Sequence, residues 1–113
     1  MKRPAKPSKF LNIKTEVDGF TFASKKEARR YGELRMLERA GHLSDLKVQP
    51  RFDLSVNGSK VCAYVGDFEY LQPAGSARRV VEDVKSEITR KHPVYRIKNK
   101  LFKAVMGFEI TEV

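Results

Sequence analysis

The sequence has few of the side chains that build zinc sites, disulfides and histidine-dependent active sites. Its 113 residues include one cysteine, Cys62, and two histidines, His42 and His92. A single thiol excludes an internal disulfide and a zinc site made of several thiolates, so we expect Cys62 to be a small buried apolar side chain. Neither histidine has a second ligand at zinc spacing or the context that an HNH nuclease or a serine hydrolase requires. A phosphate contact remains open to His92.

Long apolar runs and glycine-rich phosphate loops are also absent. No stretch approaches the roughly 18 apolar residues of a membrane span, and no apolar segment follows the basic N-terminus. We therefore expect a cytoplasmic protein with no membrane partner. The absence of a glycine-rich loop argues against a nucleotide cofactor.

Positive charge dominates what is present. Lysine and arginine number 23 against 14 aspartates and glutamates, which gives a net charge of +9. Such a balance favours a polyanionic partner, and nucleic acid first, because contacts to phosphates release condensed counterions. A basic surface that only aids solubility is the alternative. With 41% hydrophobic and 33% charged residues, the chain is typical of one soluble globular domain.

The sequence divides into a short basic arm and this domain. Residues 1–9 contain four basic residues, two prolines and no acid, which is typical of a flexible arm. Residues 10–113 are expected to form a single domain. At its start, apolar positions in residues 10–22 alternate around Asp18-Gly19, a strong signal for a two-residue hairpin turn.

A first helix is predicted over residues 24–40. Ser24 and Glu27 have the spacing of a capping box, and Gly41 supplies a residue that can end the helix in the left-handed conformation. Its apolar positions recur at helical spacing. They are Ala28, Tyr31, Leu34 and Leu37.

Three strands are predicted after this helix, followed by a second helix and a last strand. The strand ranges are about 47–56, 60–71, 78–86 and 108–113. Turn signals at Asn57-Gly58 and at residues 73–76 make the first three strands antiparallel neighbours. The second helix begins near Pro93 and ends at Gly107. Its expected apolar face consists of Val94, Ile97, Leu101 and Val105.

Two aspartates and a lysine are expected to converge at the ends of two of these strands. Side chains alternate along a strand, so Asp83 and Lys85 share one face while Glu82 lies on the other. By the same alternation Asp67 ends an apolar row in residues 61–65, and a hairpin can bring it towards Asp83. Two carboxylates suit Mg²⁺, which polarises a phosphodiester and lowers the pKa of bound water. The alternative is a cross-strand salt bridge, worth about 0–1 kcal/mol.

Gly66-Asp67 followed by Asp83-Val84-Lys85 on the next strand resembles the split motif of the PD-(D/E)XK nuclease superfamily. The order αβββαβ is similar to that superfamily's core, although glycine stands where its name has proline. The chain also resembles a phage-borne family of small proteins regarded as endodeoxyribonucleases. This second resemblance lies in residues 24–41, 49–50, 67–70, 82–85 and 95–102. The implied fold is α/β (α+β), a restriction-endonuclease-like core with a central mixed sheet flanked by helices and an N-terminal β-hairpin.

The resemblance implies roles for individual residues. Asp67 and Asp83 would be ligands of Mg²⁺ or Mn²⁺ together with the backbone carbonyl of Val84, and Lys85 would position the attacking water. The superfamily often adds an acid from its first helix. Glu27 is the position carried over and Glu33 is the alternative, but Glu27 could also simply close the capping box with its serine.

Several polar and basic residues are expected to contact DNA. Gln49 precedes Pro50 at a strand start and could reach the site. The others directly follow the motif lysine and would contact the phosphate backbone, positioning the DNA rather than specifying its sequence. They are Thr89, Arg90, Lys91, Tyr95, Arg96, Lys98 and Lys100.

The expected function is a metal-dependent endodeoxyribonuclease. Because so small a chain has little surface for reading bases, selection of branched, nicked or flapped DNA is expected rather than of a long sequence. Holliday-junction resolution is one such reaction, and it would require a homodimer. The alternative is a non-catalytic nucleic-acid-binding module with a nuclease-like fold, in a phage recombination or packaging complex. If the chain is phage-encoded, the compartment is the host cytoplasm.

Overall fold

The computed structural model describes residues 13–113. The described part begins with a hairpin of two antiparallel strands, β1 (Thr15–Val17) and β2 (Phe20–Phe22). Asp18 and Gly19 turn between them with φ of 52° and 81°, as a two-residue hairpin turn requires. The predicted hairpin is therefore confirmed over these residues. The predicted basic arm, residues 1–9, lies outside the described residues, as do residues 10–12.

The first helix, α1 (Lys25–Arg39), forms as predicted. The Ser24 side chain accepts a hydrogen bond from the backbone N–H of Glu27, which satisfies one of the free donors at the helix start. Gly41, with φ of 82°, follows the helix end. Its buried residues are Ala28, Tyr31 and Leu34, with Leu37 packed at their edge.

A four-stranded mixed sheet forms the centre of the molecule. Its order is β3-β6-β7-β8, with β7 and β8 parallel and the other pairs antiparallel. The bounds are β3 (Ser44–Val48), β6 (Phe68–Leu71), β7 (Arg79–Asp83) and β8 (Thr111–Glu112). A separate antiparallel ribbon consists of β4 (Arg51–Val56) and β5 (Ser59–Val65).

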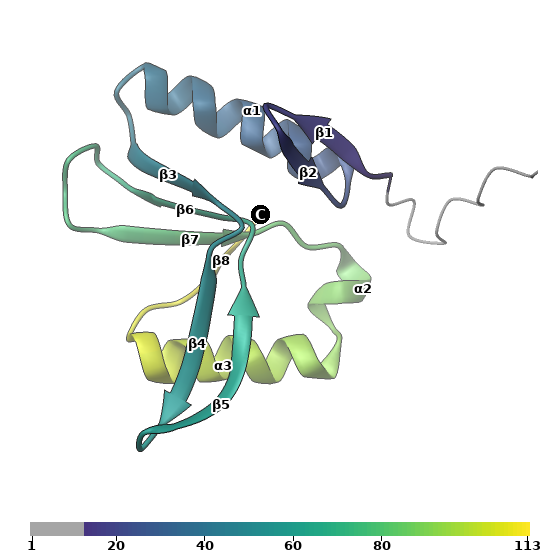
Figure 1. Cartoon of the computed structure of the whole chain (residues 1–113), viewed down its shortest axis with the longest axis vertical. Helices are drawn as coiled ribbons and strands as arrows, with labels where there is room; N and C mark the ends of the chain where they lie inside the picture. Colours follow the sequence, from purple (N-terminus) through teal and green to yellow (C-terminus); the bar gives the residue numbers. More distant parts are fainter. Residues whose placement is uncertain (1–12) are drawn as a thin grey trace, which may run out of the picture.

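The prediction of unbroken strands over 47–56 and 60–71 is wrong. The first is divided at Gln49, which has φ of 54°, and at Pro50, and the second is divided at Gly66 and Asp67. The two breaks lie opposite each other, because the Gln49 N–H donates to the Asp67 carbonyl and the Gly66 N–H to the Pro50 carbonyl. Both strands therefore bend together, and β4 and β5 run away from the sheet across α3 (Figure 1).

The predicted strand 78–86 ends early and is followed by a helix that the sequence did not predict. β7 stops at Asp83, and α2 (Glu87–Arg90) begins after Ser86, whose side chain accepts from the Thr89 N–H. A capping box closed by threonine has a weaker signature than one closed by glutamate. The last strand is also shorter than the predicted 108–113.

The second long helix, α3 (Pro93–Met106), has the predicted bounds but not the predicted buried face. Gly107 ends it with φ of 85°. Tyr95 and Phe102 are buried, whereas Val94, Ile97 and Val105 are exposed. The aliphatic positions and the aromatic positions each recur at helical spacing, and the aromatic stripe fills the space under β4 and β5.

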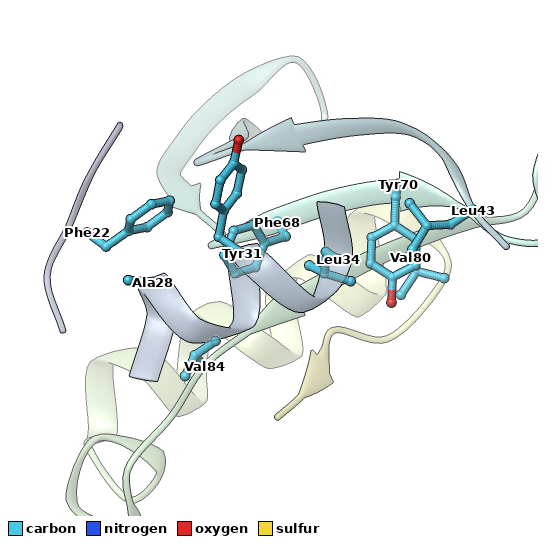
Figure 2. Packing of buried hydrophobic residues seen from close by; sticks show 9 residues of the cluster. All are labelled: Phe22, Ala28, Tyr31, Leu34, Leu43, Phe68, Tyr70, Val80 and Val84. Carbon is cyan, nitrogen blue, oxygen red and sulfur yellow. The ribbon is translucent and has the colours of Figure 1, made fainter. Parts of the chain in front are cut away.

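Two hydrophobic clusters hold the layers together, one on each side of β7. Val80 and Val84 pack with α1, β2 and β6 in the cluster drawn in Figure 2. Val81 faces the other way, towards the second cluster, which contains residues of β4, β5 and α3. The mixed α+β fold thus places α1 and the hairpin on one side of the sheet and α3 on the other (Figure 1). Within residues 13–113, no helix is long and apolar enough to cross a membrane.

Candidate active site

Asp67 lies at the bend between β5 and β6. Its N–H donates to the Glu82 carbonyl at 3.0 Å, and its Oδ2 accepts from the Val84 N–H at 2.6 Å. Gly66 gives the bend room, because an added Cβ there would lie 3.2 Å from Val81 Cγ1. The strand break therefore fixes the Asp67 carboxylate against the end of β7.

Asp83 and Lys85 meet on one face of the chain after β7, as the alternation predicted. Asp83 is only 3% exposed, and its two oxygens have different partners: Lys85 Nζ lies 3.1 Å from Oδ1, and the Tyr64 hydroxyl donates to Oδ2 at 2.5 Å. Lys85 Nζ also lies 4.2 Å from the ring centre of Tyr95, a cation–π distance. Contacts on both sides thus hold the lysine and the carboxylate.

Glu82 points to the opposite face, again as predicted. It is fully buried, and its oxygens accept from Arg30 Nε at 2.8 Å and Arg30 Nη2 at 2.7 Å. The Tyr70 hydroxyl donates to it as well. The hydrogen bond to Glu82 raises the pKa of Arg30 further above its usual range. This pair joins α1 to the sheet and lies outside the cavity of Asp67 and Asp83.

Of the two glutamates considered in the first helix, the structure brings only Glu27 to Asp67 and Asp83. Glu27 lines the same cavity, and its carboxylate accepts from the Ala23 N–H at 3.2 Å. The capping interaction is therefore made one residue earlier than predicted, because the partner is Ala23 rather than Ser24. Glu33 is exposed and pairs with Arg30.

A cavity of about 330 Å³ joins these groups. Its walls come from the start of α1, the Asp67 bend, the end of β7 and the start of α2. Burial raises the pKa of Asp67 well above its usual range, the Val84 N–H opposes this, and Asp83 adds to it. Burial also raises the pKa of Glu27, and Asp83 contributes again. Carboxylates are therefore crowded here to a degree that favours a proton or a cation between them.

The donor set fits a hard divalent cation. Asp67 and Asp83 offer carboxylate oxygens, and Mg²⁺ is often held by one or two carboxylates while it keeps several waters. Among the side chains that the structure describes, no three from histidine, cysteine, aspartate or glutamate are grouped closely enough to hold a metal by themselves. The Val84 N–H donates to Asp67 Oδ2, and this contact does not involve the Val84 carbonyl, which the resemblance implies as a further ligand. A metal bound here would therefore take its ligands from two aspartates, from a backbone carbonyl and from water.

The residues predicted to contact DNA separate into two groups. Gln49 lines a neighbouring cavity with Glu27 and Asp67, and its side chain donates to the Thr21 carbonyl at 2.9 Å. The others near the site are Thr89, Tyr95 and Lys98, which line a cavity between β5 and α3. The Tyr95 ring is buried beneath Lys85, and its hydroxyl donates to Glu112.

The second group does not line these cavities. Arg90 lies 3.4 Å from Glu112, and the other three are exposed basic residues. They are Lys91, Arg96 and Lys100. On α3, helical spacing puts Arg96 and Lys100 on a different face from Lys98. These four residues therefore lie outside the lining of the two cavities.

Two contributors were missed from the sequence. Tyr64 lies between Ala63 and Val65 in β5. Because side chains alternate along a strand, Tyr64 faces the opposite side from Val65, towards Asp83 and α3. Lys26, beside Glu27, donates to the Lys85 carbonyl at 3.2 Å. Strand alternation could have identified Tyr64, because it puts the phenol on the face of β5 opposite to Ala63 and Val65. No sequence pattern indicated the long-range contact of Lys26.

Comparison with known proteins gives a family but no activity. Residues 7–110 match a family model described as a protein of unknown function (DUF1064). No curated protein and no solved structure matches the chain.

Proposed function

The chain belongs to the DUF1064 family of proteins of unknown function, and we propose that it is a metal-dependent endodeoxyribonuclease. The observation that carries the proposal is the convergence of Glu27, Asp67, Asp83 and Lys85 in one cavity. They come from α1, from the bend between β5 and β6, and from the end of β7. A structural salt bridge would need only the lysine and one carboxylate, so the two additional half-buried acids, Glu27 and Asp67, favour a cation-binding site.

The element order also supports the resemblance to a PD-(D/E)XK core. If each bent strand is counted once, α1 is followed by three strands, then α3 and β8, with the short α2 inserted before α3. The motif then spans the second and third strands, as in the αβββαβ core. The proposal includes the assignment of this core. It also includes a single domain formed by residues 10–113 and a basic arm formed by residues 1–9.

Mg²⁺ or Mn²⁺, when bound, would polarise the scissile phosphate and lower the pKa of a bound water. Asp67 and Asp83 would hold the cation, with the Val84 backbone beside them. Lys85 would orient the attacking water and stabilise developing charge, because Asp83 and the Tyr95 ring fix its ammonium. Glu27 would take a proton or bind through water.

The DNA would lie along a basic surface around the cavity. Thr89 lines the candidate cavity, Lys98 lines the adjoining cavity, and Gln49 lines another cavity that also contains Asp67. Arg90, Lys91, Arg96 and Lys100 would meet phosphates farther away. We propose selection of branched, nicked or flapped DNA by shape, and a homodimer if paired cuts are made in a Holliday junction. The localisation proposed is cytoplasmic.

The test is cleavage of labelled four-way-junction, flap, duplex and single-stranded DNA with Mg²⁺, Mn²⁺ or EDTA. Wild type should cut at least one substrate only with metal, and Asp83→Ala should lose this cutting while keeping DNA affinity. Asp53→Asn is the matched control, because Asp53 is an exposed aspartate paired with Lys60 on the β4–β5 ribbon. Thermal denaturation must show that Asp83→Ala is folded, since the change leaves Tyr64 and Lys85 without their partner.

A non-catalytic nucleic-acid-binding module is the second candidate. The observation that favours it is that no three metal-binding side chains are grouped among those described in the structure. It predicts tight DNA binding with no cutting of any substrate by folded wild type, and no effect of Asp83→Ala beyond stability.

A further inference from the structure

A second cavity continues the candidate active site along the groove between β5 and α3. Its volume is about 380 Å³, and it shares Val65, Lys85 and Thr89 with the cavity that contains Asp67 and Asp83. Its other lining residues include His92, Val94 and Lys98. A strand that leaves the candidate active site past Lys85 would therefore enter this groove.

Half-exposed aliphatic side chains line this groove beside the basic ones. Val65 and Val94 are each 54% exposed, and both line the cavity. Duplex DNA presents phosphates and sugars on its outside and keeps its base faces stacked. Exposed valines beside the active site therefore gain little from a duplex, whereas the faces of unpaired bases can cover them.

Hydrogen-bond donors for phosphates lie in the same groove. His92 caps α3 by accepting from the Val94 N–H with Nδ1 at 3.2 Å, so in the neutral ring the proton is on Nε2. This N–H has no role in the cap and can donate to a phosphate. Lys98 Nζ donates to the Ala63 carbonyl at 2.9 Å, which anchors the ammonium in the groove and leaves its other protons for an anion.

From these features we infer that the groove between β5 and α3 holds an unpaired DNA strand next to the cleavage site. Bases contact Val65 and Val94, and the backbone contacts His92 and Lys98. The inference rests on the proposed nuclease function and specifies its substrate: the arm that enters this groove is single-stranded, as in a flap, rather than one of the paired arms of an intact junction.

The test is binding without chemistry. Fluorescence anisotropy in EDTA would measure the affinity of the full chain for a labelled oligothymidylate of about twelve nucleotides and for a duplex of the same length. We expect Val94→Asn to weaken single-strand binding about fivefold and duplex binding less than about twofold. Val105→Asn is the matched control, because Val105 is an exposed valine on the same helix and outside the cavity.

A second variant tests the polar side of the groove. His92→Asn keeps a good helix cap and removes the imidazole N–H, so we expect about threefold weaker single-strand binding with unchanged thermal stability. Equal losses for single strand and duplex, or no loss from either variant, would overturn the inference. Because EDTA excludes cleavage, a strand preference that depends on Val94 supports the inference even if no substrate is cut. Cutting by a protein without that preference would refute only the inference.

Discussion

At the scale of single residues, the candidate site depends on which groups are buried beside which others. Asp83 has each oxygen engaged, one by Lys85 and one by Tyr64, on one side of β7. Glu82 is engaged by Arg30 and Tyr70 on the other side. Two neighbouring acids in one strand thus have matched phenol partners but different surroundings, and of the two it is Asp83 that lines the cavity of Asp67.

The matched phenols allow a direct prediction. Tyr64→Phe should destabilise the fold by about 1–3 kcal/mol, because a buried carboxylate loses a hydrogen bond, and it should also weaken Mn²⁺ binding about tenfold by freeing the Asp83 carboxylate to rotate. Tyr70→Phe should cost similar stability and leave Mn²⁺ binding unchanged. Urea unfolding and calorimetric titration measure the two effects. Equal Mn²⁺ affinity in both variants would rule out a positioning role for Tyr64.

The raised pKa of Asp67 predicts how stability depends on pH. Burial favours the protonated carboxyl in the folded chain, so the folded state binds a proton that the unfolded state releases above about pH 4. Metal-free protein should therefore lose stability as the pH rises from about 5 to about 8, and Asp67→Asn should flatten this slope. Melting temperatures in EDTA over this range measure it. A wild-type melting temperature that rises with pH, or an unchanged slope in Asp67→Asn, would contradict the assignment.

At the scale of helices and strands, two features differ from what the spacing of apolar residues predicted. The strands predicted as continuous are bent where Gln49 and Pro50 oppose Gly66 and Asp67, and this bend both starts the β4–β5 ribbon and exposes the Asp67 carboxylate to the cavity. In α3 the aromatic stripe is buried in place of the aliphatic one. The spacing of apolar residues identified the helix. It left two apolar faces that could be buried, and the face with the larger aromatic side chains packs in the core.

The choice between these stripes has a measurable consequence. Ile97 is 67% exposed and Phe102 is fully buried against Phe52 and Tyr64. Ile97→Lys should therefore change the free energy of unfolding by less than about 0.5 kcal/mol, whereas Phe102→Ala should cost about 3–5 kcal/mol. Chemical denaturation distinguishes them, and a large loss from Ile97→Lys would mean that the predicted aliphatic face is the packed one.

At the scale of the whole molecule, a net charge of +9 in 113 residues gives the basic surface a long-range attraction for polyanions. The candidate site is acidic within that surface. A basic surface around these carboxylates suits a protein that attracts DNA through its phosphates and binds a cation where the DNA makes contact.

This charge predicts strong salt dependence of DNA binding. The affinity for any short DNA should fall by about tenfold or more between about 50 mM and about 200 mM salt, because bound cations return to the phosphates. The loss should be almost the same for wild type and Val94→Asn, since valine contacts no phosphate. Anisotropy titrations at several salt concentrations test it. Affinity that is absent or insensitive to salt would favour a basic structural protein over both nucleic-acid readings.

Local residue preferences were enough to predict the features that depend on neighbouring residues. The hairpin at Asp18-Gly19, the start of α1 at Ser24 and the end of α3 at Gly107 follow from local backbone preferences. Alternation along β7 correctly placed Asp83 and Lys85 on one face and Glu82 on the other.

The features that depend on packing between distant segments could not be predicted from local preferences. These features are the common bend of two strands at Asp67, the buried aromatic face of α3, and the contact of Tyr64 with Asp83. Each outcome depends on volume and hydrogen bonding between residues far apart in the chain. Periodicity gives the faces of an element, but the available space decides which face is buried.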